Sequence, residues 1–582
     1  MRRARTLSVT AASALLAGLV LAVVPASPAA AEEVVERPAG GVFAVEGHGW
    51  GHGRGMSQWG SQGAATLGRT AEEIVSSYYP GTTRTVLAPA RMRVLLQSDT
   101  DGDLQVHAAA GLTVTDLASG VTEVLPGGPS RWRAYVSIAG LHLQSQTDGA
   151  WYPYALKGVD ALAGPVRFSA PTFTRVALPG GTSRDYRGVV QAVKTGGNVA
   201  ATVVVLDLED YLLGVVPRES PASWRPAALQ AQSIAARSYS ANKRERVAGA
   251  GHWDICDTTQ CQVFGGSRLY TSSGVTELEP ASTTEAVRAT AGVVRTYGGK
   301  SIFAEFSSSN GGHSTTGDFP YLAAKPDPWD GATPNSVHAW NASLPVADLE
   351  RRFPAVGRLL RVRVTARDGN GEWGGRVKAV VLEGVSSTGA PTSVSTTGAG
   401  VYGARTWPAT SDGLKSSWWR ILAPSYSSGI VSQSTAPSLV RPPGAPSTGT
   451  LDVALRNNGT ASWPVDGLHL VVASPPGEAD PLAGGSTRPG VLLRNATRPG
   501  AATVEPGETA DLRVRIDAAG VPAGTHGRTY RLRIGAGAVF GAPVSWTVTV
   551  TQQSAPTSSP APTATPVPSR PLFKGSGPAR LR

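Results

Sequence analysis

The spacing of hydrophobic residues changes along the chain, and each change predicts a different kind of element. From residue 86 to about residue 205, apolar and polar positions alternate in short runs separated by turn sequences such as Asp101-Gly102, which is typical of β-strands. Residues 226–247 carry apolar side chains at helical spacing behind Pro226, which suits the first turn of a helix. A second helix is expected over 282–290, before strand patterns resume. This order predicts an α+β region with β-rich insertions.

A different pattern begins near residue 450. From there to residue 552 every second residue is apolar in successive runs, and Gly and Pro clusters separate the runs. About seven such strands predict an all-β sandwich of Ig-like type, without the cysteine pair of antibody domains. The Ser-, Pro- and Gly-rich residues 425–449 are expected to form a linker, and residues 553–582 a disordered Pro-rich tail.

Residues 41–85 form a compact, Gly-rich block. Glycine occupies every second position from 47 to 55, which predicts a tight loop and argues against a helix there. A helix is expected farther on, over 70–79, because Thr70 and Glu73 have the spacing of a capping box.

The first 31 residues have the layout of a secretory signal peptide. Three arginines precede an apolar run that is interrupted at Pro25, and three alanines at 29–31 resemble a cleavage site. The run is short for a membrane span of about 20 residues, and no later segment is long and apolar enough for one. We therefore expect a secreted or cell-wall protein with no integral membrane segment once the signal is removed.

Composition narrows the class of partner. Of 582 residues, 41% are hydrophobic, which argues against a wholly disordered chain. The net charge of +11 falls to +8 when the three signal arginines are removed. In an exported protein this excess of positive charge favours attraction to an anionic cell envelope, and no nucleic acid is expected as a partner.

The carboxylate of Glu219 lies where the backbone is restricted, which suits a side chain that must keep a fixed orientation. Glu219 lies between Pro217 and Pro221, which restrict the backbone in a loop just before a helix. Acidic residues near helix starts often serve only as caps, so the residues alone leave a structural role open. Glu209 and Asp210 open a short predicted helix over 209–216, and we expect them to be structural.

Four sequence motifs together resemble the SpoIID/LytB family, over about residues 41–423. They are LEDYLLGVVPRESP (208–221) with ALQAQ (228–232) and AARSY (235–239), ICDTTQCQVFGG (255–266), FSSSNGG (306–312) and GHGRGMSQWG (51–60). In SpoIID itself the last motif lies at the C-terminal end of the domain, whereas here it comes first. This difference suggests a circular permutation within the fold.

The resemblance implies a peptidoglycan lytic transglycosylase that prefers glycan strands stripped of their stem peptides. The alternative that it also implies is a non-catalytic enhancer of an N-acetylmuramoyl-L-alanine amidase, or a cell-wall-binding protein. By motif position, the acid/base glutamate falls on Glu219 and an important arginine on Arg237. The family's PYL element places Tyr321 as a weaker candidate for substrate binding.

Cys256 and Cys261, the only two cysteines, follow the predicted catalytic helix. In an exported protein a disulfide between them is the simpler interpretation, and we expect no cofactor. The alternative is a structural zinc site with His252, since some SpoIID-like enzymes bind zinc with Cys and His in this region. Only three good ligands are visible for a metal that usually takes four.

The remaining candidates are side chains expected to line a cleft. The Gly-rich loop offers His48, His52 and Gln58 as sugar or acid partners. The FSSSNGG motif offers Ser308 and Asn310. The prediction is thus a SpoIID-like α+β catalytic domain over 86–424, completed by the block 41–85 and followed by the sandwich over 450–552.

Overall fold

The computed structural model describes residues 33–38, 41–248, 250–402, 413–442 and 447–554. The predicted signal peptide (1–31) and nearly all of the predicted tail (553–582) lie outside these ranges. The chain divides into two compact units. Met1–Arg37 and Phe43–Leu422 make up the first unit, and Pro38–Val42 and Ala423–Arg582 make up the second.

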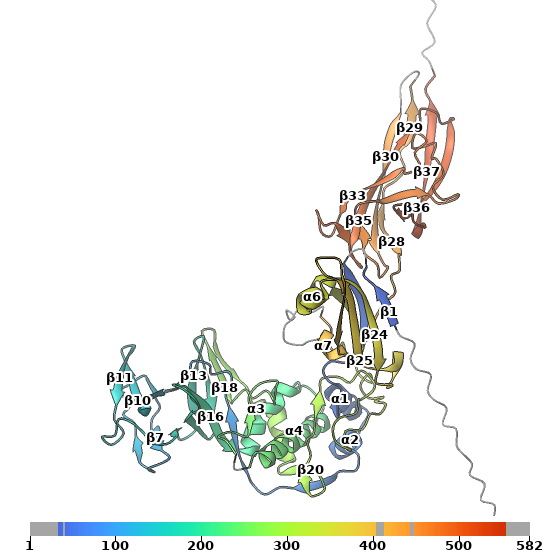
Figure 1. The fold of residues 1–582 in the computed structure, drawn as a ribbon. Coiled ribbons are helices and arrows are strands. Elements are labelled where there is room, and N and C mark those ends of the chain that lie inside the picture. Colours follow the sequence, from blue (N-terminus) through green and yellow to red (C-terminus); the bar gives the residue numbers. More distant parts are fainter. Residues whose placement is uncertain (1–32, 39–40, 249, 403–412, 443–446, 555–582) are drawn as a thin grey trace, which may run out of the picture. The chain divides into compact units, whose positions relative to one another are not determined.

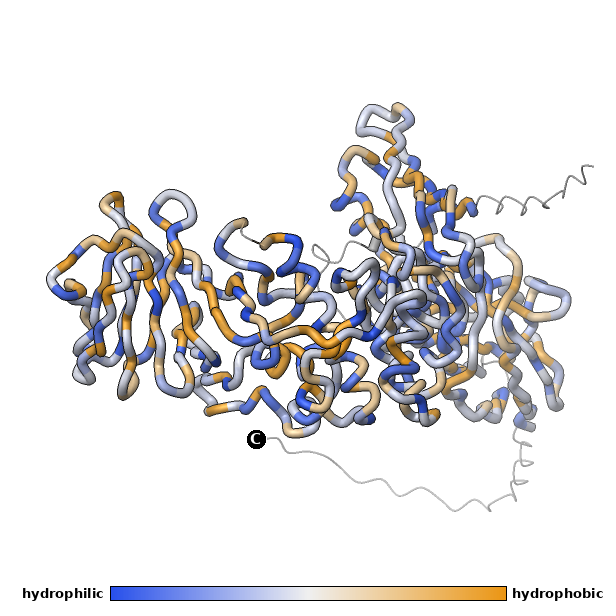
Figure 2. The backbone as a smooth tube through the Cα atoms, turned by 90° about the horizontal axis from the view of Figure 1, so that it is seen from below, coloured by the Kyte–Doolittle hydropathy of each residue, from blue (hydrophilic) through white to orange (hydrophobic). Residues whose placement is uncertain are grey.

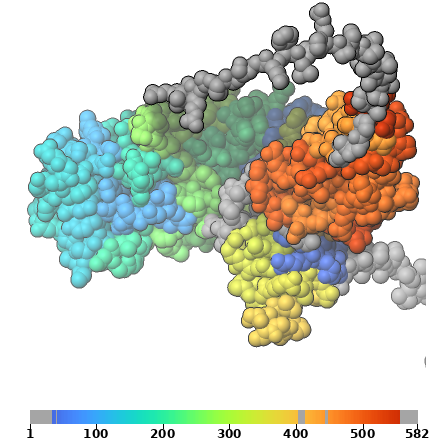
Figure 3. All heavy atoms as spheres, turned by 90° about the horizontal axis from the view of Figure 1, so that it is seen from above, coloured from blue at the N-terminus to red at the C-terminus, as the bar shows by residue number. Residues whose placement is uncertain are grey.

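Most of the strand patterns before residue 205 fold into two sheets at one end of the first unit, coloured blue to turquoise in Figure 3. Along these strands buried and accessible residues alternate, and Figure 2 shows the matching change between hydrophobic and hydrophilic colours. The seven-stranded sheet has the order β17 (Ile255–Cys256), β5 (Arg91–Leu95), β16 (Ala200–Asp207), β15 (Val189–Lys194), β12 (Val166–Ser169), β7 (Thr113–Asp116) and β8 (Thr122–Val124). The eight-stranded sheet has the order β11 (Ala150–Tyr154), β10 (Gly140–Thr147), β9 (Arg131–Ser137), β6 (Leu104–His107), β13 (Thr174–Leu178), β14 (Thr182–Tyr186), β18 (Arg268–Thr271) and β19 (Gly274–Glu277).

A layer of helices follows these sheets (Figure 1). Its members are α1 (Gln58–Thr66), α2 (Ala71–Tyr78), α3 (Leu208–Glu219), α4 (Pro226–Arg246) and α5 (Ala281–Ala289). The long helix α4 begins at Pro226 as predicted and packs against the other four helices. Its buried residues are mostly small Ala and Ser, which lets the neighbouring helices approach closely. The predicted capping box of α2 is confirmed: Thr70 accepts from the Glu73 amide and Glu73 accepts from the Thr70 amide.

The first unit also contains several smaller sheets. A four-stranded sheet has the order β1 (Glu33–Glu36), β24 (Arg358–Arg367), β25 (Val377–Val385) and β26 (Pro391–Thr396). Two three-stranded sheets are β23 (Ala339–Pro345), β2 (Val42–His48), β27 (Trp419–Ile421) and β21 (Lys300–Ser301), β20 (Val293–Tyr297), β4 (Thr83–Val86). The short helices α6 (Val346–Arg352) and α7 (Gly398–Tyr402) and two 3₁₀ turns, Pro354–Val356 and Glu372–Gly374, complete this part.

The second unit is all β, as the alternating pattern predicted. One continuous hydrogen-bonded order joins β28 (Ser428–Gln433), β30 (Thr448–Asn457), β35 (Thr509–Asp517), β33 (Gly490–Asn495), β32 (Leu468–Val472), β36 (Gly524–Ile534), β37 (Phe540–Gln552) and β29 (Ser438–Arg441). A small ladder pairs β31 (Trp463–Pro464) with β34 (Thr503–Val504). The strands enclose one hydrophobic core that includes Trp463 and Tyr530. The Ig-like arrangement of two sheets stays a prediction.

The predicted linker over 425–449 is wrong in its described part. It supplies β28, β29 and the start of β30. Leu439 on β29 is buried in the core, and β29 pairs in parallel with β37. The two strands β28 and β29 lie at the ends of the sheet order, where few side chains are buried. The apolar alternation is therefore weak there, and the Ser- and Pro-rich composition indicated a linker instead.

The predicted end of the helix before Glu219 is also wrong. We expected it to stop at residue 216 and leave Glu219 in a loop, but α3 continues through Pro217 and ends at Glu219. Proline lacks an amide proton, so in the last turn it removes a single helical hydrogen bond, and the amide of Ser220, the residue after the helix, still donates to Val216 O at 3.0 Å. Glu219 is thus attached to a helix end.

Candidate active site

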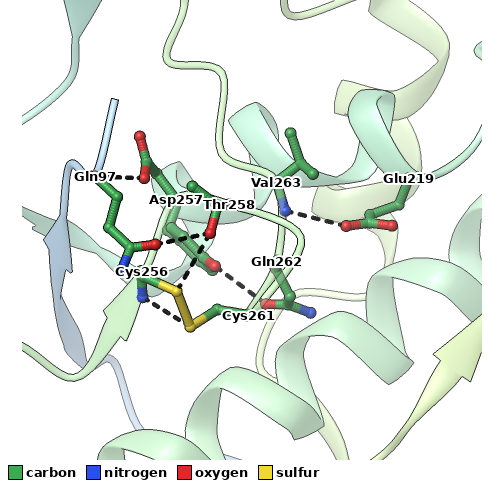
Figure 4. The surroundings of a disulfide bond; sticks show 9 residues. Gln97, Glu219, Cys256, Asp257, Thr258, Cys261, Gln262 and Val263 are labelled. Carbon is green, nitrogen blue, oxygen red and sulfur yellow. Dashed lines mark hydrogen bonds between the residues drawn. A yellow bond between two sulfur atoms is a disulfide. The ribbon is translucent and has the colours of Figure 1, made fainter. Parts of the chain in front are cut away.

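The Glu219 carboxyl group lies at the C-terminal end of α3 and is held by two donors. Its Oε1 accepts from the backbone amide of Val263 at 3.2 Å, as Figure 4 shows, and its Oε2 accepts from Gln58 Nε2 at 3.3 Å. Burial raises the pKa of this carboxyl group, against the smaller lowering effect of the two hydrogen bonds. The C-terminal end of a helix dipole also disfavours a negative charge. Glu219 therefore retains its proton to a higher pH than an ordinary glutamate.

Glu219 forms part of the wall of a cavity of about 670 Å³. Segments far apart in the sequence line it: the Gly-rich block, the end of α3, one face of α4, residues 259–263 of the disulfide loop, and residues 303–308. Those with charged, polar or aromatic side chains include Trp50, His52, Arg54, Gln58, Arg218, Glu219, Tyr239, Lys243, Phe303, Glu305, Phe306 and Ser308. The predicted site residues Glu219, His52, Gln58 and Ser308 are therefore brought together.

The Gly-rich block reaches the cavity through a short parallel ladder between β3 (Met56–Ser57) and β22 (Phe306–Ser307). Gly55 precedes β3 with a φ of +65°, and a Cβ atom on it would lie 2.0 Å from the Glu305 carbonyl oxygen. Only glycine permits both that backbone conformation and that approach. The ladder places Gln58, the first residue of α1, against Glu219.

His52 lies in the cavity wall as a neutral group. Burial lowers its pKa to about 3, and the positive charges of Arg54 and Arg376 act in the same direction. Its Nδ1 accepts from the Arg54 amide at 3.0 Å, which places the ring proton on Nε2. The ring therefore stabilises the loop and does not titrate near neutral pH.

A second carboxylate, which the motif analysis missed, belongs to Glu305. Arg54 binds it with two parallel hydrogen bonds, from Nε to Oε2 at 2.9 Å and from Nη2 to Oε1 at 2.7 Å. Both oxygens of Glu305 are thus engaged by a cation, whereas Glu219 has no cation paired with it in the described part of the chain. The two carboxyl groups of the cavity therefore differ: Glu305 is paired with a cation, whereas Glu219 keeps its proton to a higher pH than an ordinary glutamate.

Helix α4 contributes Tyr239 and Lys243, one turn apart on the face that lines the cavity. The Tyr239 ring stacks on Phe303, with 4.7 Å between centroids. Burial raises the pKa of Tyr239 to about 12, with further contributions from the charges of Glu305 and Glu219. Its hydroxyl therefore stays protonated and can donate. The helical spacing of 239 and 243 is a signal that could have identified this pair from the sequence.

Arg237 does not face the cavity. Its side chain is 0% exposed and forms an ion pair with Glu209, from Nε to Oε1 at 2.8 Å and from Nη2 to Oε2 at 2.7 Å. The same guanidinium donates to the backbone carbonyl groups of Val287 and Val293. The expectation that Arg237 is a catalytic residue is therefore corrected: in the described residues it forms no hydrogen bond or ion pair with a cavity side chain, and it ties α3, α4, α5 and the start of β20 together. The expected structural role of Glu209 agrees with this pairing.

Three other expected substrate contacts lie outside the cavity. His48 packs against Trp373 and Trp418, and its Nδ1 is hydrogen-bonded to the His338 carbonyl group. The Tyr321 ring is buried and its hydroxyl accepts from the Phe303 amide at 3.0 Å. Asn310 is fully buried and donates to Asp327 Oδ2 at 2.7 Å. Each of these side chains is held by contacts within the protein and belongs to its framework, although His48 Nε2 has only Glu372 Oε2 near it in the described part of the chain, at 3.4 Å.

Cys256 and Cys261 form a disulfide bond (Figure 4), the pairing that the sequence favoured over zinc. Both sulfur atoms are in that bond, so neither is available as a thiolate ligand, and His252 is exposed. Within the described ranges, no group of three or more His, Cys, Asp or Glu side chains is arranged to hold a metal ion. The disulfide closes the loop that precedes Val263, whose amide binds Glu219.

The family model described as SpoIID, Stage II sporulation protein, matches residues 197–297. This chain carries a SpoIID domain. The domain supplies Glu219, the cavity face of α4 and the disulfide loop. Gln58, Arg54 and Glu305 come from outside the matched range, so the cavity is completed by flanking sequence.

Curated relatives agree with this assignment. The chain is 39% identical over 125 residues to an amidase enhancer of Bacillus subtilis (strain 168), a match that covers 20% of this chain and 15% of the relative. It is 32% identical over 142 residues to stage II sporulation protein D of the same organism, covering 22% and 41%. The same protein from Bacillus amyloliquefaciens is 31% identical over 175 residues, covering 28% and 50%. The chain thus spans at most half the length of these relatives. In the described part of the chain, no helix is long and apolar enough to span a membrane.

Proposed function

We propose that the protein is an exported lytic transglycosylase that cleaves peptidoglycan glycan strands, with Glu219 as its single acid and base. The observation that carries the proposal is the state of Glu219, a carboxyl group in the wall of a cavity, with a raised pKa and no paired cation in the described residues. An acid of this kind is what protonation of a glycosidic oxygen requires near neutral pH.

The reaction proceeds without an activated water. Glu219 gives its proton to the oxygen that joins muramic acid to glucosamine, and the bond between that oxygen and the anomeric carbon breaks. The 6-hydroxyl oxygen of the muramic residue bonds to the anomeric carbon, and its proton passes to Glu219. The product ends in a 1,6-anhydro sugar, and the carboxyl group is protonated again.

The pairing of Glu305 with Arg54 supports this choice over hydrolysis. Hydrolysing glycosidases ordinarily use a second carboxylate, as a base for water or as a nucleophile. Both oxygens of Glu305 accept from Arg54, which leaves that carboxylate poorly suited to either task. Arg54 and Glu305 are better suited to hold the shape of the cavity.

The proposed setting is the cell wall. The N-terminal residues have the pattern of a secretory signal, and the excess of positive charge suits an anionic envelope. The all-β second unit has no catalytic group that we can identify in its described residues, and we assign it to wall attachment or partner binding. The favoured substrate is glycan stripped of stem peptides.

A second candidate function is that of a non-catalytic amidase enhancer. One observation favours it: the relative that is 39% identical over its matched region is named an amidase enhancer. With this function the cavity would bind glycan, or the protein would bind an amidase, and Glu219 would cleave no bond.

The test is digestion of peptide-free glycan strands by the purified chain, with products analysed by mass spectrometry. The proposal expects 1,6-anhydro-muramic ends from the wild type and none from Glu219→Gln, which keeps the size of the side chain and one acceptor oxygen but cannot serve as an acid. A wild type that yields no such ends, and stimulates an amidase equally with and without the Glu219→Gln change, establishes the enhancer function instead.

A further inference from the structure

The charges around the cavity do not balance. Arg54 is neutralised by Glu305. Arg218 and Lys243 also line the cavity, and within the part of the chain that the structure describes neither is paired with a carboxylate. With Glu219 protonated, the cavity therefore presents two positive charges that the protein itself leaves uncompensated.

Lys243 is held at a defined place in the wall of the cavity that Glu219 also lines. Its Nζ lies 5.8 Å from the centroid of the Tyr239 ring and 5.4 Å from that of Phe303, which stack on each other. Cation–π contacts of this kind hold the side chain and leave the ammonium protons free to bind an anion. The Tyr239 phenol is in turn close enough to feel the charges of both Glu219 and Glu305. Tyr239 and Lys243 are separated by about 6 Å along the helix axis.

Arg218 comes from a different helix than Lys243: it precedes Glu219 in the last turn of α3. Its guanidinium packs against Gly265, where a Cβ atom would lie 2.7 Å from Nε. Burial and the charge of Arg184 both disfavour its protonated form and lower its pKa. An arriving anion relieves this repulsion, whereas a neutral sugar would cover the cations and cost them their hydration.

We propose that Lys243, supported by Arg218, forms an anion subsite for a carboxylate on the sugar whose glycosidic bond Glu219 protonates. The inference rests on the proposed function and assigns the group that selects its substrate. In a muramic residue that lacks its stem peptide, the lactyl group on the ring ends in a carboxylate. When the peptide is attached, the same position is a neutral amide. Lys243 thus distinguishes the two forms by charge.

The test measures binding to the Glu219→Gln chain, which does not turn the strands over. Peptide-free glycan strands are compared with the same strands whose carboxyl groups have been converted to methylamides. One charge-assisted hydrogen bond predicts roughly ten- to a hundredfold tighter binding of the carboxylate form. Lys243→Met should remove most of this preference, and Lys243→Arg should keep part of it. Lys194→Met, which removes an exposed lysine outside the cavity, should leave the preference unchanged.

Three results overturn the subsite. The first is equal binding of the acid and amide forms by the Glu219→Gln chain with Lys243 in place. The second is a preference that persists when Lys243→Met is added. The third is competition by poly(glycerol phosphate) as strong as that of the glycan, since the site would then bind anions of any kind. Failure of the proposed function gives a different result: the wild type releases no anhydro ends, while the Lys243-dependent preference in binding remains.

Discussion

Replacing Arg237 with Met is expected to destabilise the protein and to leave the chemistry of the cavity intact. The guanidinium is fully buried and binds Glu209 of α3 as well as the carbonyl groups of Val287 and Val293. Methionine fills a similar volume without any donor. The substitution therefore removes the cation that pairs with Glu209, which keeps its hydrogen bond from the Gly292 amide, and the donor to two carbonyl oxygens.

The size of the loss follows from the burial of the pair. Removing one partner of a buried ion pair costs about 3–5 kcal/mol. The Glu209 side chain is 39% exposed and regains water when Arg237 is removed, so we expect the lower end of that range, about 3 kcal/mol. At roughly 2 °C per kcal/mol for a unit of this size, Tm should fall by about 6 °C.

The assay combines thermal unfolding with glycan cleavage per folded molecule. Arg288→Met is the matched control, because Arg288 is exposed on α5, and its free energy of unfolding should change by less than about 0.5 kcal/mol. The reasoning is refuted if Arg237→Met unfolds at the wild-type temperature and yet loses cleavage, since Arg237 would then act on the substrate.

Two further outcomes follow from the site. Since the pKa of Glu219 is raised in the folded protein, its buried carboxyl group contributes stability while protonated, and this is lost as pH rises through the folded pKa. Chemical denaturation should therefore show Glu219→Gln to be more stable than the wild type above that pH. The same pKa should limit wild-type cleavage on the alkaline side. A stability difference between the two proteins that does not vary with pH contradicts the raised pKa of Glu219. Replacing both Cys256 and Cys261 with Ser opens a short loop and should cost about 2 kcal/mol by the chain-entropy relation. Cleavage should weaken, because the loop supplies the Val263 amide to Glu219, and unchanged activity and Tm in the double variant would show that the loop is held by other contacts.

Local signals predicted most of the elements around the site. Thr70 and Glu73 predicted the N-terminal cap of α2, and Pro226 predicted the first turn of α4. Both features depend only on residues within one helical turn. The predictions were wrong where burial overrides local preference. The strand around Leu439 is set by pairing with β37, more than a hundred residues away, and no local pattern reports such a partner.

The candidate site shows the same division. The sequence alone identified Glu219 as the residue to examine, placed Gln58 and Ser308 near it through motif position, and favoured the pairing of Cys256 with Cys261. These conclusions depend on residue type, spacing and family resemblance, all of which are properties of the chain itself. They did not indicate which charged side chains would form ion pairs.

Only the tertiary structure decided which charged side chains around Glu219 are paired and which are not. Arg54 and Glu305 are 251 positions apart and meet through the β3–β22 ladder, so no spacing rule could join them. Arg237 is paired with Glu209 outside the cavity, whereas Arg218 and Lys243 line the cavity without a paired carboxylate in the described residues. The physical reason is that a pKa and an ion pair depend on burial and on distance in space, and both are set when distant segments pack together.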